Sequence, residues 1–92
     1  MSAELIILPV AEAELLTLPQ PELRRILMHM DFLCEFPRAA QAAEFAGFPD
    51  LRRAVSGNYL IYYAFDAARN AVRVYTVRHA ARTPLRDSDI RR

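Results

Sequence analysis

The sequence contains a single cysteine, Cys34, has no lysine, and lacks any long hydrophobic run. One cysteine cannot form a disulfide within the chain, so a disulfide-stabilised framework is excluded and a reducing compartment is expected. The histidines His29 and His79 lie far apart, and neither stands at metal-ligand spacing from Cys34. We therefore expect a cytoplasmic protein that carries no metal and no other cofactor.

The longest apolar run, Tyr59 to Phe65, is far shorter than the roughly 20 residues that a membrane-spanning helix needs. The apolar stretch near the N-terminus stops at Pro9 and has no positive residue before it, so we expect no signal peptide. The sequence also has no glycine-rich phosphate loop, no Walker motif and no supported Ser-His-Asp arrangement. These absences argue against a membrane protein, a P-loop nucleotide hydrolase and a serine hydrolase.

Charge is distributed unevenly along the chain, although the net charge is only +1. Residues 1–50 contain eight acidic residues and three arginines, which gives −5. Residues 51–92 contain nine arginines and three acidic residues, which gives +6. Because arginine binds carboxylates and phosphates through two hydrogen bonds at once, the basic half is expected to face an anionic partner, either nucleic acid or an acidic polypeptide.

A length of 92 residues and a hydrophobic fraction of 53% predict one small folded domain spanning residues 1–92. A chain of this size buries roughly 60–70% of its unfolded surface, which is enough for one core. The charged stretch at residues 85–92 is expected to be flexible. The high apolar content also leaves side chains available for an interface with a partner protein.

Two helices are predicted in the N-terminal half. Val10 to Thr17 contains good helix formers with acidic residues in the first turn. Pro21 to Phe36 places apolar side chains three and four residues apart, which is typical of an amphipathic helix. Cys34 lies on this apolar stripe and is expected in the core, whereas His29 lies beside the stripe and is expected at the surface. The alanine-rich segment Ala39 to Ala46 is expected to add a further helical stretch.

Four strands are predicted, at Glu4 to Leu8, Leu51 to Val55, Tyr59 to Phe65 and Ala71 to His79. The third is apolar on both faces, as expected of a central strand. Short turns join the last three into an antiparallel meander, and the first strand is expected at an edge. The order β-α-α-β-β-β predicts an α+β fold, in which a two-helix hairpin packs on one face of a small antiparallel sheet.

The opposite face of this sheet is left partly open, and arginines of the C-terminal half are expected to line it. The cationic candidates are Arg52, Arg53, Arg73, Arg78, His79 and Arg82. Strict alternation along the last strand places Val72, Val74 and Thr76 on one face and Arg73, Tyr75 and Val77 on the other.

If the cationic side chains converge, the arginines would hold phosphates while His79 exchanged protons near neutral pH. Tyr62 or Tyr75 would stack on a base or assist proton transfer. This combination suits RNA cleavage by attack of the 2′-hydroxyl. The alternative is a solvated charged face on which His79 only bonds the backbone.

Three segments carry a resemblance to a known family: Leu51–Arg53, Gly57–Tyr63 and Val77–Pro84. With the order of the predicted elements, they resemble the RelE/ParE superfamily, the toxins of bacterial type II toxin–antitoxin pairs. The resemblance spans nearly the whole chain in element order, while specific residue matches are confined to these C-terminal segments. It implies a compact fold of a helical hairpin on an antiparallel sheet, neutralised by a small antitoxin that wraps the toxin.

The resemblance implies two possible targets. RelE-like members cut mRNA in the ribosomal A site, and ParE-like members inhibit DNA gyrase. RelE-like nucleases usually carry an arginine at the position of Leu60, so the leucine removes a phosphate-holding group. ParE-like toxins tend to end the last strand in His-Gly-Ala-Arg, and here only the glycine differs, as Ala80. The residues therefore favour the ParE-like branch.

The favoured interpretation is a gyrase-inhibiting toxin without catalytic residues, held by a cognate antitoxin in a hetero-oligomer. The residues expected to bind the target are Arg73, Arg78, His79 and Arg82, and those expected to bind the antitoxin are Tyr59, Tyr63 and Phe65. The first alternative is a ribosome-dependent mRNA endonuclease with catalytic candidates Arg52, Arg53, Arg78, His79 and Arg82. The second alternative is a non-toxic binding module, a degenerate toxin.

Overall fold

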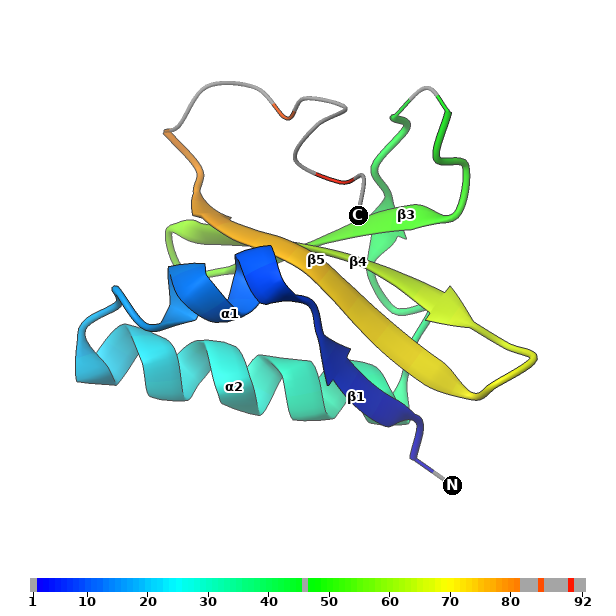
Figure 1. The fold of residues 1–92 in the computed structure, drawn as a ribbon, viewed down its shortest axis with the longest axis horizontal. Helices are drawn as coiled ribbons and strands as arrows, with labels where there is room; N and C mark the ends of the chain where they lie inside the picture. The colour runs from blue at the N-terminus through cyan, green and yellow to red at the C-terminus, as the bar shows by residue number, and fades with distance from the viewer. Residues whose placement is uncertain (1, 46, 82–84, 86–89, 91–92) are drawn as a thin grey trace.

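The computed structural model describes residues 2–45, 47–81, 85 and 90. Its elements follow the order β1, α1, α2, β2, β3, β4 and β5 (Figure 1). The helices are α1 (Pro9–Leu15) and α2 (Gln20–Glu35), and the strands are β1 (Glu4–Ile7), β2 (Gln41–Ala42), β3 (Leu51–Ser56), β4 (Tyr59–Asp66) and β5 (Ala71–His79). Arg82 and most of the predicted flexible tail lie outside the described residues.

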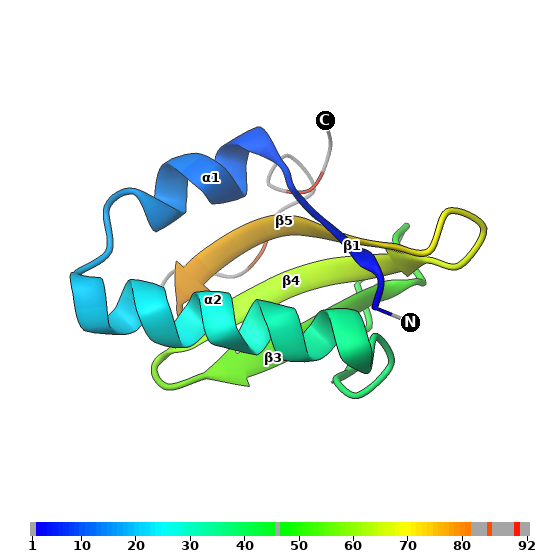
Figure 2. The same cartoon turned by 90° about the horizontal axis from the view of Figure 1, so that it is seen from below.

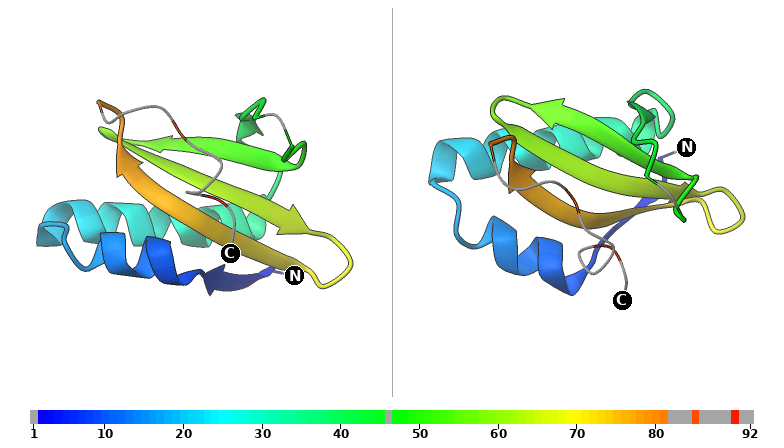
Figure 3. Two further views of the ribbon diagram at one scale, coloured as in Figure 1. Left: turned by 45° about the horizontal axis from the view of Figure 1, so that its top comes forward. Right: turned by 90° about the horizontal axis from the view of Figure 1, so that it is seen from above.

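The strands form a single five-stranded sheet in the order β1-β5-β4-β3-β2. Both helices cover one face of this sheet (Figure 2), and the opposite face is seen with the strands in front of the helices in the right-hand view of Figure 3. The α+β class, the two-helix layer, the β3-β4-β5 meander and the edge position of β1 are therefore confirmed.

Two features of the sheet differ from the prediction. Strand β1 pairs with β5 in parallel, so the sheet is mixed, because the chain crosses over through both helices and the meander before β5 returns beside β1. The segment expected to be helical, Ala39 to Ala46, instead contains the short strand β2, which pairs with β3. Here an edge strand outweighs the helix preference of the alanines.

Helix α2 forms because its apolar residues repeat at helical spacing and two prolines lie at or beside its start. Its inward face buries Ile26, Met30, Leu33 and Cys34 against the sheet. Burying each large aliphatic side chain contributes about 1.5–3 kcal/mol, so this face anchors the helix. Burial, followed by the nearby carboxylates of Asp31 and Glu35, raises the pKa of the Cys34 thiol, which therefore stays unreactive, as expected of a core residue.

A two-residue turn, Gly57-Asn58, joins β3 to β4, because Ser56 pairs directly with Tyr59. Gly57 has a φ of +61°, a conformation that residues with a Cβ rarely adopt, and Arg25 Nη1 lies 2.8 Å from the position of the missing Cβ. The turn therefore requires glycine at this position.

We expect Gly57→Ala to lower the free energy of unfolding by about 1–2 kcal/mol, mainly through backbone strain, because the Arg25 side chain can move aside. Urea denaturation measures the loss. Asn58→Ala in the same turn is the control, because Asn58 is not among the residues with positive φ. Equal losses in the two variants would show that the φ of Gly57 is not the cause.

Neither described helix is both long and apolar enough to span a membrane.

Candidate functional site

The helix-free face of the sheet carries a second apolar cluster, separate from the core beneath the helices. Leu51, Tyr62 and Ile90 are its buried members. Its partly buried members are Ala43, Phe45, Phe48, Leu60, Tyr75 and Leu85. We call this surface the open face. Its centre is therefore apolar, and its charged residues lie around that centre.

A bulge in β5 decides which C-terminal side chains reach the open face. Tyr62 pairs with Thr76 and Tyr63 pairs with Val74, so Tyr75 has no residue opposite it. The extra residue reverses the alternation that follows. Val77 therefore packs in the core beneath the helices, where strict alternation had predicted the other face. The next residue along β5, Arg78, consequently lies opposite Leu60 on the open face.

The predicted cationic cluster is divided between the two faces of the sheet. On β3, Arg53 lies opposite Tyr62, so the register places it on the side of the open face with Arg78. Arg53 also lines a hollow at the edge of β3 with His29 and Phe32 of α2. Arg52 lies opposite the core residue Tyr63 and points to the helix side. Its Nη1 donates to the carbonyl oxygens of Ala40, at 2.6 Å, and Arg38, at 3.4 Å, so this guanidinium holds the chain leading into β2.

Arg78 is only 5% exposed, so it is a buried cation and not part of a solvated rim. Arg53 is half-buried, and its Nε is inaccessible and has no hydrogen-bond partner among the described residues. A buried donor without a partner is costly, and because Arg53 Nε is inaccessible, an incoming anion would have to meet the terminal nitrogens of the guanidinium.

His79 lies at the exposed end of β5, away from the open face. Its ring packs edge to face against Tyr59, with centroids 5.3 Å apart. The Ala81 N–H donates to His79 Nδ1 at 3.1 Å, so Nδ1 acts as an acceptor and the proton of the neutral ring is on Nε2. Because Arg53 and Arg78 lie on the other face, the described residues do not bring His79 together with them.

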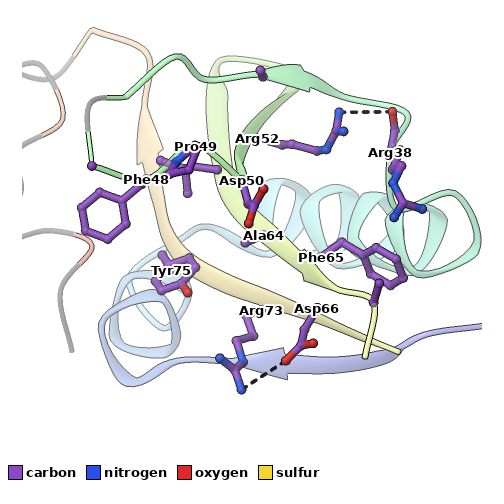
Figure 4. Close-up of a pocket in the computed structure, with 14 residues that line it drawn as sticks. Arg38, Phe48, Pro49, Asp50, Arg52, Ala64, Phe65, Asp66, Arg73 and Tyr75 are labelled. Atoms are coloured by element: carbon purple, nitrogen blue, oxygen red, sulfur yellow. Dashed lines mark hydrogen bonds and ion pairs between the residues drawn. The ribbon is translucent and has the colours of Figure 1, made fainter. Parts of the chain in front are cut away.

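A hollow of about 570 Å³ opens where β3, β4 and β5 meet the segment before β3 (Figure 4). Its charged lining consists of Arg38, Arg52, Arg73, Asp50 and Asp66, with Phe48, Leu51 and Tyr75 among the apolar lining. Three arginines against two aspartates leave it weakly positive, so it suits a ligand with both an anionic and an apolar part.

Part of that positive charge is already neutralised. Asp66 Oδ2 lies 3.0 Å from Arg69 Nη1 and 3.8 Å from Arg73 Nη2. The hydrogen bond from the Arg69 side chain, followed by its backbone N–H and the charges of both arginines, lowers the pKa of the Asp66 carboxyl. Arg38 in turn lies 4.9 Å from the centroid of the Phe65 ring, in a cation–π contact. Sequence reasoning did not find Arg38 or Asp66, because neither stands in a recognisable motif.

The residues expected to bind an antitoxin lie on the helix side. Tyr59 and Phe65 are half-buried against the core, whereas Tyr63 is completely buried. The Tyr63 hydroxyl donates to the Pro37 carbonyl oxygen at 2.7 Å. Its side chain thus fixes the chain that leaves α2 and is not available at the surface of this structure.

We expect Tyr63→Phe to lower the free energy of unfolding by about 1–2 kcal/mol, because it removes that hydrogen bond and leaves the carbonyl without it. Tyr75→Phe is the control, since the described residues offer its hydroxyl no partner. Burial raises the pKa of Tyr63. Unfolded tyrosine ionises near pH ~10. Above that pH the unfolded state loses its proton first, so stability should fall as pH rises, and less steeply in Tyr63→Phe.

Among the described residues, no group of three or more His, Cys, Asp or Glu side chains is placed to hold a metal ion.

Comparisons with solved structures identify the fold. A chain of the RelBE2 toxin–antitoxin complex from Mycobacterium tuberculosis superposes with a TM-score of 0.79, at 19% identity, over 89% of this chain and 95% of that one. The isolated RelE toxin of E. coli gives 0.75, at 21% identity, over 89% and 88%. A chain of the RelE–RelB complex from the archaeon Pyrococcus horikoshii gives 0.73, at 23% identity, over 90% and 100%.

No family model matches the sequence, and a search of the curated proteins finds no match. The solved structures thus show that this chain has the fold of RelE toxin structures, as the resemblance to the RelE/ParE superfamily predicted. They do not distinguish the ParE-like branch from the RelE-like one.

Proposed function

We propose that this chain is the toxin of a type II toxin–antitoxin pair and is neutralised by a cognate antitoxin. The observation that supports this most is the superposition on a chain of the Mycobacterium tuberculosis RelBE2 complex, which spans nearly the full length of both chains. The sequence motifs of β3, β4 and β5 resemble the same superfamily independently of that superposition. The uneven charge also fits an acidic partner on the basic half.

The ribosome with its mRNA is the first target we propose, because the matched structures described above are of RelE toxins or RelE-type complexes. In this interpretation Arg53 binds a phosphate at the open face. Arg73, at the hollow, would hold the RNA backbone further along. A separate proton donor or acceptor is then required, because His79 lies on the other side of the sheet.

DNA gyrase is the second target, and the open face itself favours it. Leu60 occupies the position where RelE-like nucleases usually carry an arginine, and the buried centre around it is apolar. Partly exposed members of this centre, such as Leu60 and Tyr75, present apolar surface at this position, which suits a protein–protein contact more than a nuclease site. In this interpretation Arg73 binds the target without catalysing a reaction, whereas Arg78 would first have to become exposed and His79 would bind from the other side of the sheet.

Two assays run in parallel with the same purified chain separate these targets. With mRNA on programmed ribosomes, the proposal predicts new RNA ends in the A-site codon. With gyrase and relaxed plasmid, the second candidate predicts inhibited supercoiling. Cleaved mRNA with normal supercoiling at excess protein would leave the ribosome as the target. Inhibited supercoiling with intact mRNA would leave gyrase as the target. Inactivity in both assays would contradict both targets.

A further inference from the structure

Helix α2 exposes a second apolar surface on the side that faces away from the sheet. Met28 is 66% exposed, Phe32 47% and Phe36 57%. Phe32 and Phe36 pack together, with ring centroids 5.1 Å apart. These side chains contribute nothing to the core, and large apolar residues grouped on one exposed face mark an interaction surface. The view of Figure 2 looks onto this helix with the sheet behind it.

The exposed residues follow the pattern of a helix-pairing seam. Arg25, Met28, Phe32 and Glu35 follow one another at spacings of three, four and three residues, which is the a/d repeat of a coiled coil. All four are exposed; the Arg25 guanidinium packs beside Gly57 and Glu35 accepts a hydrogen bond from Ser2, so both side chains would turn outward when two helices pair. We call them the outer seam. The inward residues of α2 form a different stripe, so the helix has one face for its own sheet and one free for another helix.

Charge and size along the outer seam match the same seam on a second copy running antiparallel. Positions 25 and 35 lie equally far from position 30, and so do positions 28 and 32. A two-fold axis that passes between the two helices, at the level of position 30, therefore places Arg25 against Glu35 of the other copy. The same axis places Met28 against Phe32 of the other copy. The first is an ion pair and the second a sulfur–aromatic contact, and symmetry makes each occur twice.

We propose that the chain forms a two-fold homodimer through the outer seam of α2, with the two helices antiparallel. Parallel pairing would set Arg25 against Arg25 and Glu35 against Glu35, so the charges select the antiparallel arrangement. The N-terminal half of the helix carries Arg24 and Arg25 against one acid, Glu22, and the C-terminal half carries Asp31 and Glu35. The opposite net charges of the two halves give the same preference. The inference does not depend on the proposed function.

The test is sedimentation of the full chain over a range of concentrations, using chemically synthesised and refolded protein so that toxicity does not limit the yield. The wild type should move from monomer to dimer as concentration rises. Phe32→Glu places a carboxylate at the centre of the seam twice, so it should raise the dimer dissociation constant more than about 100-fold. Leu16→Glu, at a residue 81% exposed outside the seam, is the matched control and should leave it unchanged.

Charge exchange tests the register. Arg25→Glu alone and Glu35→Arg alone each create two like-charged pairs and should each weaken the dimer about 10-fold. Mixing these two variants should restore dimerisation as a heterodimer, and the double variant should restore the homodimer. Glu35 also accepts a hydrogen bond from Ser2, so this rescue separates the interface from a local effect.

A wild type that stays monomeric at every concentration would overturn the proposal. So would a dimer that Phe32→Glu leaves intact, or single charge variants that mixing fails to rescue. If the chain is monomeric and the same variants instead weaken binding of its antitoxin, the seam belongs to that partner and the homodimer is excluded. Circular dichroism of each variant confirms that the fold is retained.

Discussion

Glu14→Ala is expected to lower the free energy of unfolding by about 3–4 kcal/mol, a large share of the stability of a small domain. Glu14 Oε1 accepts hydrogen bonds from the Thr76 hydroxyl and from the Val77 N–H, both at 2.8 Å. The hydroxyl is also 3.0 Å from Oε2. Hydrogen bonds to a charged group contribute about 1.5–3 kcal/mol each, and the variant leaves both buried donors without this acceptor.

The position of Glu14 explains why the effect should be so large. Strand β1 pairs with β5 only from Ala71 to Val74, so the rest of that β5 edge has no strand beside it. Helix α1 lies along this edge, and Glu14 accepts a hydrogen bond from the Val77 N–H there. The carboxylate thus fixes the helix and the bulge, and with them the position of Arg78 opposite Leu60.

Denaturation with urea measures the loss. Glu12→Ala on the exposed side of α1 is the matched control and should change stability by less than about 0.5 kcal/mol. Glu14→Gln keeps one acceptor oxygen and should lose less than Glu14→Ala. A double-mutant cycle with Thr76→Val should give a coupling energy of about 1 kcal/mol or more. A loss in Glu14→Ala no larger than in Glu12→Ala would refute the role of this carboxylate.

Arg53→Ala is expected to lower mRNA cleavage on the ribosome about 100-fold if the first target is correct, because it removes the cation that would stabilise the transferring phosphate. Arg53 lies on the open face opposite Tyr62, two residues along β4 from Leu60. Arg53 is therefore placed to supply the positive charge that an arginine at position 60 would have supplied. Its Nε already lacks a partner among the described residues, so the substitution removes no internal bond from that atom.

Rates of RNA cleavage under single-turnover conditions measure this effect. Antitoxin affinity measured in parallel should stay within about threefold, because the residues expected to bind the antitoxin lie on the helix side of the sheet. Arg69→Ala is the control: Arg69 bonds Asp66 in the exposed β4–β5 turn, far along the sheet from Arg53. Cleavage that survives Arg53→Ala undiminished would remove Arg53 from the catalytic site. Loss of gyrase inhibition without any RNA cleavage would move the residue to the second target.

The elements that depend on short-range patterns were predictable from the sequence. The spacing of Ile26, Met30 and Leu33 predicted α2 with both ends within one residue of those observed. The apolar run of β4 identified the central strand. The parallel pairing of β1 with β5 was not predictable, because it joins segments more than sixty residues apart and no local pattern encodes the direction of an edge strand. Strand β2 exists only through its pairing with Arg52 and Arg53.

The candidate site was less predictable than the fold for one physical reason. Alternation of side chains along a strand assigns them to the correct face of the sheet only while the pairing with the next strand is regular. Because Tyr75 is unpaired, every residue of β5 after it points to the face opposite to the one that alternation predicts. That exchange brings Val77 into the core and buries Arg78 on the open face. The gyrase target, favoured from Leu60 and the end of β5, is also not supported by the RelE-type structures that share the fold.

If the chain is a toxin that an antitoxin neutralises, it should arrest growth only when that antitoxin is absent. The most direct measurement is the growth of a bacterium after induction of this chain, alone and together with a small antitoxin encoded next to it. We expect growth arrest by the chain alone, full relief by the co-expressed antitoxin, and a stable complex of the two. Normal growth with abundant, folded chain and no antitoxin would contradict the account and leave a non-toxic binding module.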